Sequence, residues 1–185
     1  MQIVVEVPCK DAREYVEQGM HQRVRPPACC PCCKRQGTLE AHDYYQRGCT
    51  DAEGHLWDIQ VRRFECTACA CVVSCLPDFA QPYRLIHNAT IQKFFAGDRV
   101  SADVVRHHDT LSRYWRTFVA WTGRLKRLLG STLGRGPPDE PAAGLWRRVL
   151  ATYRSLGAAT RCLVADFQTT CFGQYRCHQP AAQVG

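Results

Sequence analysis

Two cysteine pairs, far apart in the chain, limit what this sequence can fold into more than any other feature. The stretch ACCPCCKR (residues 28–35) holds four cysteines in five positions, and residues 66–69 form a second pair, CTAC. Two C-x-x-C pairs supply four thiolates, the ligand set that tetrahedral zinc prefers. The chain has thirteen cysteines, an odd number, and no signal-peptide pattern at its start. We therefore expect an intracellular chain with reduced thiols and a metal site, and not a disulfide framework.

The first cluster offers two pairings, Cys29 with Cys32 or Cys30 with Cys33. The second of these reads C-P-x-C, and Pro31 presets the backbone angle φ for such a turn. We favour this pairing and one structural Zn²⁺ ion, because four protein thiolates leave no open position for a catalytic water. The expected ligands are Cys30, Cys33, Cys66 and Cys69, with Cys29, Cys32, His42, Cys71 and Cys75 in reserve.

The 32 residues between the two cysteine pairs predict a β-hairpin. Residues 38–48 (TLEAHDYYQRG) suit a first strand, and residues 49–54 (CTDAEG) read as a turn. Residues 55–66 alternate apolar and polar side chains, the period of a half-buried strand. The second strand would return Cys66 to the first pair, as in a zinc ribbon. Buried free cysteines are the alternative, whereas a redox pair is disfavoured because no thioredoxin-like βαβ pattern surrounds either pair.

The positive charge of the chain is concentrated in its middle third. The formal net charge is +7, and residues 81–135 alone carry 10 Lys/Arg against 3 Asp/Glu. A local excess of this kind suggests a polyanion as partner, most simply nucleic acid. The alternative is an arginine-rich face that only contacts solvent.

The same segment predicts three helices. Residues 83–97 keep helical spacing, and a short helix follows with Ser101 as its N-cap and Asp103 in its first turn. Asp109 and Thr110 indicate a break between two helices, and a longer helix starts near Ser112. A helical wheel of this longer helix places apolar residues on one face and arginines on the opposite face. The apolar face holds Leu111, Trp115, Phe118, Thr122, Leu125 and Leu129, and the opposite face holds Arg113, Arg116, Ala120, Arg124 and Arg127.

This pattern fits the recognition helix of a helix-turn-helix. Arginine suits the task because its planar fork binds phosphate and guanine bidentately. An amphipathic helix with an incidental arginine face is the alternative. The predicted DNA-contacting residues are Arg106, Arg113, Arg116, Arg124, Lys126 and Arg127.

The C-terminal part predicts a linker and two helices. Residues 134–144 (GRGPPDEPAAG) are rich in proline and glycine, residues 145–157 keep helical spacing up to Gly157, and a second helix runs to about residue 170. A helical hairpin for docking or dimerisation is the favoured interpretation. A second metal site is the alternative, although no spacing demands it; its candidate ligands are Cys171, Cys177 and His178 with Cys162 or Cys9.

Four stretches, CPCCK, HDYYQRG, IQVRRFECTAC and SCLPDFAQPY, resemble a zinc-ribbon family encoded by bacterial mobile elements. That family, a domain of unknown function, is similar to the N-terminal zinc-ribbon and helix-turn-helix parts of insertion-sequence transposases. The resemblance covers about residues 28–125, and it implies the same four cysteine ligands and a DNA-reading helix after Asp109. The sequence departs from the family pattern at Lys34, where glycine is usual, and at the extra Cys29 and Cys32.

The sequence thus predicts an α+β fold in five segments. These are an N-terminal strand and short helix (1–27), a zinc ribbon (28–80), a helix-turn-helix-like region (81–133), a linker (134–144) and a helical tail (145–185). The zinc would hold the ribbon next to the DNA-reading helix. No apolar run approaches the roughly 20 residues of a membrane helix, so we expect a cytoplasmic protein without a membrane partner.

The expected function is that of a non-catalytic, zinc-dependent DNA-binding protein, an accessory or regulatory factor of a transposon or related mobile element. Its partners would be double-stranded DNA and a transposition protein such as a transposase, with self-association left open. An adaptor that docks a transposase, an ATPase or RNA polymerase is the alternative. A small transposase or nuclease is less favoured, since Asp98, Asp103 and Asp109 are explained as turn or helix-start residues and only Asp166 remains.

Overall fold

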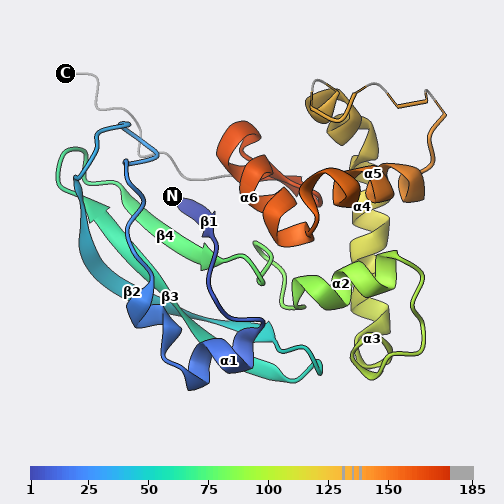
Figure 1. Cartoon of the computed structure of the whole chain (residues 1–185), viewed down its shortest axis with the longest axis horizontal. Helices are drawn as coiled ribbons and strands as arrows, with labels where there is room; N and C mark the ends of the chain where they lie inside the picture. Colours follow the sequence, from blue (N-terminus) through green and yellow to red (C-terminus); the bar gives the residue numbers. More distant parts are fainter. Residues whose placement is uncertain (131, 135, 138, 176–185) are drawn as a thin grey trace.

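The computed structural model describes residues 1–130, 132–134, 136–137 and 139–175. It confirms the mixed α+β class: a four-stranded sheet forms one half and helices form the other (Figure 1). The strands are β1 (Gln2–Val5), β2 (Leu39–Thr50), β3 (Leu56–Cys66), β4 (Val72–Pro77), β5 (Thr169–Thr170) and β6 (Gly173–Gln174). The helices are α1 (Ala12–Glu17), α2 (Asn88–Phe95), α3 (Ala102–Arg106), α4 (His108–Leu129), α5 (Ala142–Tyr153) and α6 (Leu156–Phe167), with a 3-10 turn η1 (Met20–Arg23).

The predicted hairpin is present as β2 and β3, which pair antiparallel along almost their whole length. Its turn is held by Asp51, whose Oδ1 accepts hydrogen bonds from the amides of Glu53 (3.0 Å) and His55 (2.8 Å). The indole of Trp57 donates to the other oxygen of the same carboxylate at 2.8 Å. Gly54 takes a φ of +83°, which favours glycine. The turn signals in the sequence therefore reflect real contacts.

The N-terminal segment is part of the same sheet. The strand order is β1-β4-β3-β2, and β1 pairs parallel with β4. Helix α1 is capped by Asp11, whose Oδ1 accepts from the amide of Glu14 at 3.0 Å. Tyr15 of α1 is fully buried and donates its hydroxyl to the Gln60 carbonyl of β3 at 3.0 Å. Residues 1–27 thus complete the ribbon's core.

The helices of the middle segment start at other residues than predicted. Helix α2 begins at Asn88, and Leu85 before it is 52% exposed. The break between α3 and α4 lies at His107, so α4 starts four residues before Ser112 and Asp109 lies in its first turn. The cause is a tertiary contact: His107 Nε2 donates to the Gly54 carbonyl at the hairpin turn (2.8 Å).

The predicted N-cap Ser101 does not cap its helix, whereas the two predicted faces of α4 are present. Ser101 occupies the N-cap position of α3, but its hydroxyl donates to Asp98 and does not cap the helix. The apolar face of α4 is confirmed at its centre, since Leu111, Phe118 and Leu125 are fully buried. The arginines of the opposite face are exposed.

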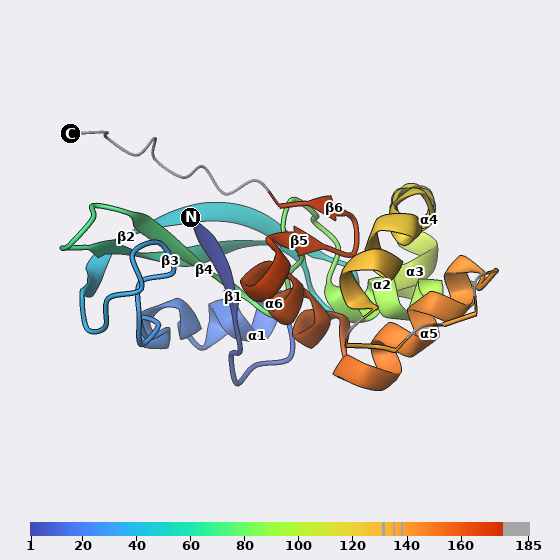
Figure 2. The ribbon, with the colours of Figure 1, turned by 90° about the horizontal axis from the view of Figure 1, so that it is seen from above.

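The C-terminal helices are built into the core. Helix α5 ends at Tyr153, not at Gly157, because Arg154 turns to a φ of +67° and the Ser155 hydroxyl caps α6 through the Ala158 amide (3.0 Å). Leu145 and Trp146 pack against the apolar face of α4. Helix α6 contacts both β1 and α5, between the sheet and the other helices (Figure 2). The predicted docking hairpin therefore uses its apolar side internally.

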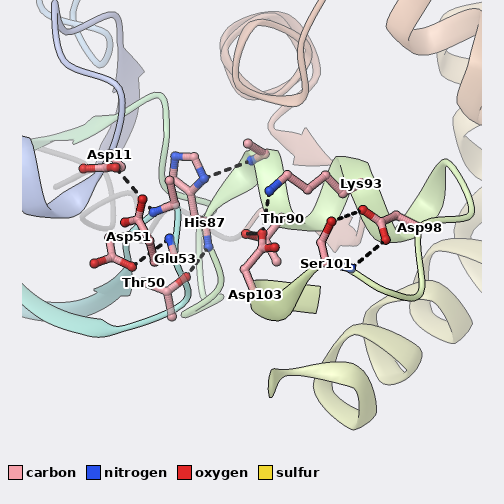
Figure 3. Close-up of polar contacts among 12 residues, drawn as sticks. Asp11, Thr50, Asp51, Glu53, His87, Thr90, Lys93, Asp98, Ser101 and Asp103 are labelled. Atoms are coloured by element: carbon pink, nitrogen blue, oxygen red, sulfur yellow. Dashed lines mark hydrogen bonds and ion pairs between the residues drawn. The ribbon is translucent and has the colours of Figure 1, made fainter. Parts of the chain in front are cut away.

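A polar junction connects the hairpin turn to the helices (Figure 3). At its centre is the buried His87, whose amide donates to the Thr50 hydroxyl (2.9 Å). Its Nε2 lies 2.9 Å from the Lys10 carbonyl, and its Nδ1 accepts from the Ala89 amide at 3.2 Å. A carbonyl can only accept, so the ring is neutral and carries its proton on Nε2. Asp103 continues the junction by accepting from Thr90 (2.7 Å) and Lys93 (2.9 Å).

Gly157→Ala should destabilise the protein by about 1–3 kcal/mol, because overpacking forces backbone shifts. A Cβ atom at Gly157 would lie 2.3 Å from the Asp78 carbonyl oxygen. Gly123→Ala is the matched control: Gly123 lies in α4 with no neighbouring atom within 4 Å of a Cβ. That change should stabilise the helix by about 0.5–1 kcal/mol. Urea unfolding of both variants measures the difference, and equal effects would contradict the packing of α6.

Stability should fall as the pH drops below about 6.5, the unperturbed histidine value. Burial lowers the pKa of His87, so the folded state favours its neutral ring. The unfolded state therefore binds a proton at His87 more readily than the folded state does. The contribution of the neutral His87 to the free energy of unfolding is fully present above the unfolded-state pKa and is lost progressively as the pH falls below it. Thermal unfolding between neutral and mildly acidic pH measures this loss. His87→Gln should flatten the dependence, and the exposed His108→Gln should not; an unchanged slope in His87→Gln would contradict the assignment.

Candidate metal centre

Four thiols converge at the end of the hairpin opposite its turn. The sulfurs of Cys30, Cys33, Cys66 and Cys69 all lie within 4.8 Å of one another. Cys30 and Cys69 are 3.8 Å apart, and Cys33 and Cys66 are 3.7 Å apart. A tetrahedral zinc site with Zn–S bonds of about 2.3 Å has sulfur–sulfur edges of about 3.8 Å. The thiols therefore fit one structural zinc ion with no position left for water.

The two cysteine loops share one backbone geometry. In the first, the amide of Lys34 donates to the Cys30 carbonyl, and in the second the amide of Ala70 donates to the Cys66 carbonyl, both at 2.8 Å. Lys34 and Ala70 have φ values of +63° and +55°. This left-handed conformation favours glycine, which explains why the family pattern has glycine where this chain has Lys34.

The reserve ligands lie outside the four-thiol group. Cys29 is exposed, and Cys71 and Cys75 are buried. Burial raises the pKa of Cys71 to about 11 and that of Cys75 to about 12, so both remain protonated thiols. The imidazole of His42 lies 3.4 Å from Glu65 on the strand surface. The structure thus brings together the pairing that Pro31 favours.

Local hydrogen bonds prepare one thiolate for the metal. The Thr38 hydroxyl lies 3.2 Å from the Cys66 sulfur, and this contact, with amides of the second loop, lowers the pKa of Cys66 to about 6. At Cys69 an amide hydrogen bond from Cys71 acts in the same direction, but burial and the neighbouring thiols raise its pKa. A divalent cation bound by the four sulfurs would remove this competition among the thiolates. Nothing in the position of Thr38 distinguishes it from other hydroxyl residues, so its contact with Cys66 was not predictable from the sequence.

The predicted DNA-contacting residues separate into two groups. Arg106 of α3 and four arginines of α4 are exposed and make no ion pair with a described residue. We call the four on α4 the α4 stripe: Arg113, Arg116, Arg124 and Arg127. Lys126 is different, because it is half-buried and its Nζ donates to the Glu140 carbonyl at 2.6 Å. Successive helical residues point about 100° apart, so Lys126 lies on a different side of α4 from Arg127.

The candidate carboxylates do not converge. Asp98 accepts from the amides of Val100 and Ser101, and Asp103 accepts from Thr90 and Lys93. Among the described residues, the four cysteines are the only cluster of three or more side chains suited to a metal ion. Cys171 is buried in the helical core. Cys177 and His178, candidates for a second site, lie outside the described residues.

The hairpin meets the start of α4 through its turn and not through its cysteine end. The hairpin turn contacts the start of α4, and the cysteines lie at the other end of β3 (Figure 1). Strand β3 has 11 residues, which span about 35 Å. A continuous hairpin therefore separates the two sites.

Comparison with known families adds one result. Residues 30–114 match the family described as a domain of unknown function (DUF6431). The matched region includes all four clustered cysteines, the hairpin and the start of α4, and it ends before Arg116. No curated protein and no solved structure matches the chain. None of the helices in the described ranges is long and apolar enough to cross a membrane.

The purified protein should contain one equivalent of zinc, measured by elemental analysis. Cys66→Ser should lose the metal and unfold at lower temperature, because a bound structural metal contributes directly to folding. Cys29→Ser is the control, since Cys29 is an exposed neighbour outside the cluster, and it should retain the metal. Metal lost in both Cys29→Ser and Cys66→Ser would show that Cys29 and Cys32 form the first pair, and metal retained in Cys66→Ser would contradict the four-cysteine site.

Proposed function

We propose that the protein is a non-catalytic, zinc-dependent DNA-binding protein that contacts double-stranded DNA through the α4 stripe. The observation that carries the proposal is the stripe itself: four exposed guanidinium groups on one helix without a carboxylate partner among the described residues. Arg113 and Arg127 are 14 residues apart, about 21 Å along a helix. This length matches several successive phosphates of a duplex.

The charges of the stripe are available to a ligand. Arg113 donates to the Thr110 hydroxyl (3.2 Å), and Arg124 lies 5.7 Å from the Trp121 ring, so both keep their charge without an ion pair. Phosphate contacts release counterions from DNA, which drives association. The guanidinium fork also suits guanine in the major groove.

Zinc has a structural part in this proposal. Four protein thiolates would hold the ion and close the open end of the hairpin. The hairpin turn then supports the start of α4 through the hydrogen bond between His107 and Gly54. The ion would supply folding energy and no reaction chemistry.

A role as an accessory or regulatory factor of a mobile element follows from the resemblance of the cysteine and proline-tyrosine stretches to a mobile-element family. A docking role for a partner protein is the second candidate. It is favoured by an apolar groove of about 490 Å³ between α2 and α5, lined by Phe95, Ala96, Ala143, Trp146, Arg147 and Leu150. Metal-dependent DNA cleavage that is lost in Asp166→Ala would instead favour an enzyme.

DNA binding should depend strongly on salt and on the stripe. With four phosphate contacts, the affinity for a duplex should fall about 100-fold between about 50 and 200 mM salt. The double reversal Arg116→Glu/Arg124→Glu should weaken binding at least about tenfold, because it replaces two phosphate contacts with repulsion. Fluorescence anisotropy with a labelled duplex measures both effects.

A matched control keeps the same change in net charge. Arg13 of α1 and Arg25, which follows the η1 turn, are exposed residues of the N-terminal segment and do not belong to α4. Arg13→Glu/Arg25→Glu should leave DNA affinity nearly unchanged. Equal losses of DNA affinity in the two double variants would show that only the net charge of the protein matters, and not the position of the arginines. Absence of DNA binding by the wild type at low salt would refute the proposal.

A further inference from the structure

Three large apolar side chains are exposed in neighbouring segments, Tyr83 and Leu85 between β4 and α2 and Leu56 at the start of β3. Tyr83 is 68% exposed, Leu85 52% and Leu56 63%. A Cβ atom placed on Gly48 of β2 would lie 3.1 Å from Leu56 Cδ1 and 3.4 Å from Leu85 Cδ2, so both leucines cover the same point of the strand. We call Tyr83, Leu85 and Leu56 the apolar patch. Large apolar side chains exposed as a group mark interaction sites more often than single ones do.

Tyr83 is presented by an unfavourable backbone conformation. Its φ is +58°, a left-handed value that a tyrosine seldom adopts. Pro82 precedes it, and the Arg84 amide donates to the Gln81 carbonyl (3.1 Å) to close the turn. Backbone strain of this kind tends to occur at functional positions. Here it leaves the Tyr83 ring mostly exposed, with the ring centroid of Tyr175 at 5.6 Å.

The patch is fixed in position against α4 and β2. The Thr50 amide donates to the Leu85 carbonyl at 2.8 Å, and the Leu85 amide donates to the Tyr114 hydroxyl of α4 at 3.3 Å. Tyr114 directly follows Arg113, the first residue of the α4 stripe. Successive residues of a helix point about 100° apart, so a ligand held on that stripe would have to extend around α4 from Arg113 to reach the patch.

The charges around the patch suit an anionic ligand. Arg47 donates to the carbonyls of Gln81 and Arg84, and the Arg84 guanidinium lies 5.0 Å from the Tyr114 ring. One carboxylate is nearby, Asp58, which pairs with Gly48 in the sheet. The three positive charges of Arg47, Arg84 and Arg113 exceed the single negative charge of Asp58. Aromatic and aliphatic side chains next to arginines suit bases that have left the duplex stack, whose phosphates pair with the cations.

We infer that the apolar patch binds unpaired bases of a DNA molecule held on the α4 stripe. The preferred ligand is then a duplex that contains an unpaired segment, not a regular duplex. This inference rests on the proposed DNA binding and adds the kind of DNA that is recognised.

The test compares a regular duplex with the same duplex that carries a short unpaired segment, using fluorescence anisotropy. The wild type should bind the second probe about tenfold more tightly, because base stacking contributes at this level. Tyr83→Gly should remove the preference and leave the affinity for the regular duplex unchanged. Its melting temperature should change little, because relief of the left-handed backbone strain offsets the lost contact with the Tyr175 ring. Leu85→Ser should weaken the preference in the same direction.

Tyr44→Ala is the matched control, because Tyr44 is an exposed tyrosine of β2 that packs against His21 of the η1 turn. It should keep the preference. Equal wild-type binding of both probes would overturn the patch inference and leave the α4 proposal intact, whereas no binding of either probe would overturn both. Equal losses for the two probes in Tyr83→Gly, or an effect on self-association alone in sedimentation, would also overturn the inference.

Discussion

The convergence of four cysteine sulfurs is the constraint on which the sheet half of this protein depends. Each pair sits in a loop whose fifth residue is forced into a left-handed conformation, and together the loops join the start of β2 to the end of β3. A small sheet with one helix on its face has little core to fix these ends. Cys30 and Cys66 are fully buried there. Coordination of a metal ion by these thiols would compensate for the limited apolar area.

The other half is organised by a different contact. The hairpin turn reaches the break between α3 and α4, where Gly54 and His107 share a hydrogen bond. Buried polar groups around His87 and Asp103 are all satisfied, which ties the turn to α2 and α3 with little apolar surface. Helix α6 adds a second connection by packing against β1 and α5. The two halves are therefore joined by polar contacts on one side and by an apolar helix on the other.

The sequence predicted those features that depend on local pattern. Alternation placed β3, Pro31 selected the cysteine pairing, and the wheel separated the two faces of α4. Prediction from the sequence failed where contacts between residues far apart in the chain determine the structure. The helix break moved to His107 because of Gly54, and β1 joined the sheet by pairing with β4. Lys126 is half-buried because Glu140, 14 residues later, accepts its hydrogen bond, whereas its role as a DNA contact stays a prediction.

The separation of the cysteines from α4 by a full hairpin limits what the metal can influence. Screening in physiological salt reduces charge–charge effects beyond about 8 Å, so the net charge of a metal–thiolate group would contribute almost nothing to the field around Arg116 or Arg124. The ion would influence the helix only mechanically, through the stiffness and angle of β2 and β3. Exchange of zinc for another tetrahedral ion of the same size would then leave the behaviour of α4 unchanged, even though complete loss of metal would not.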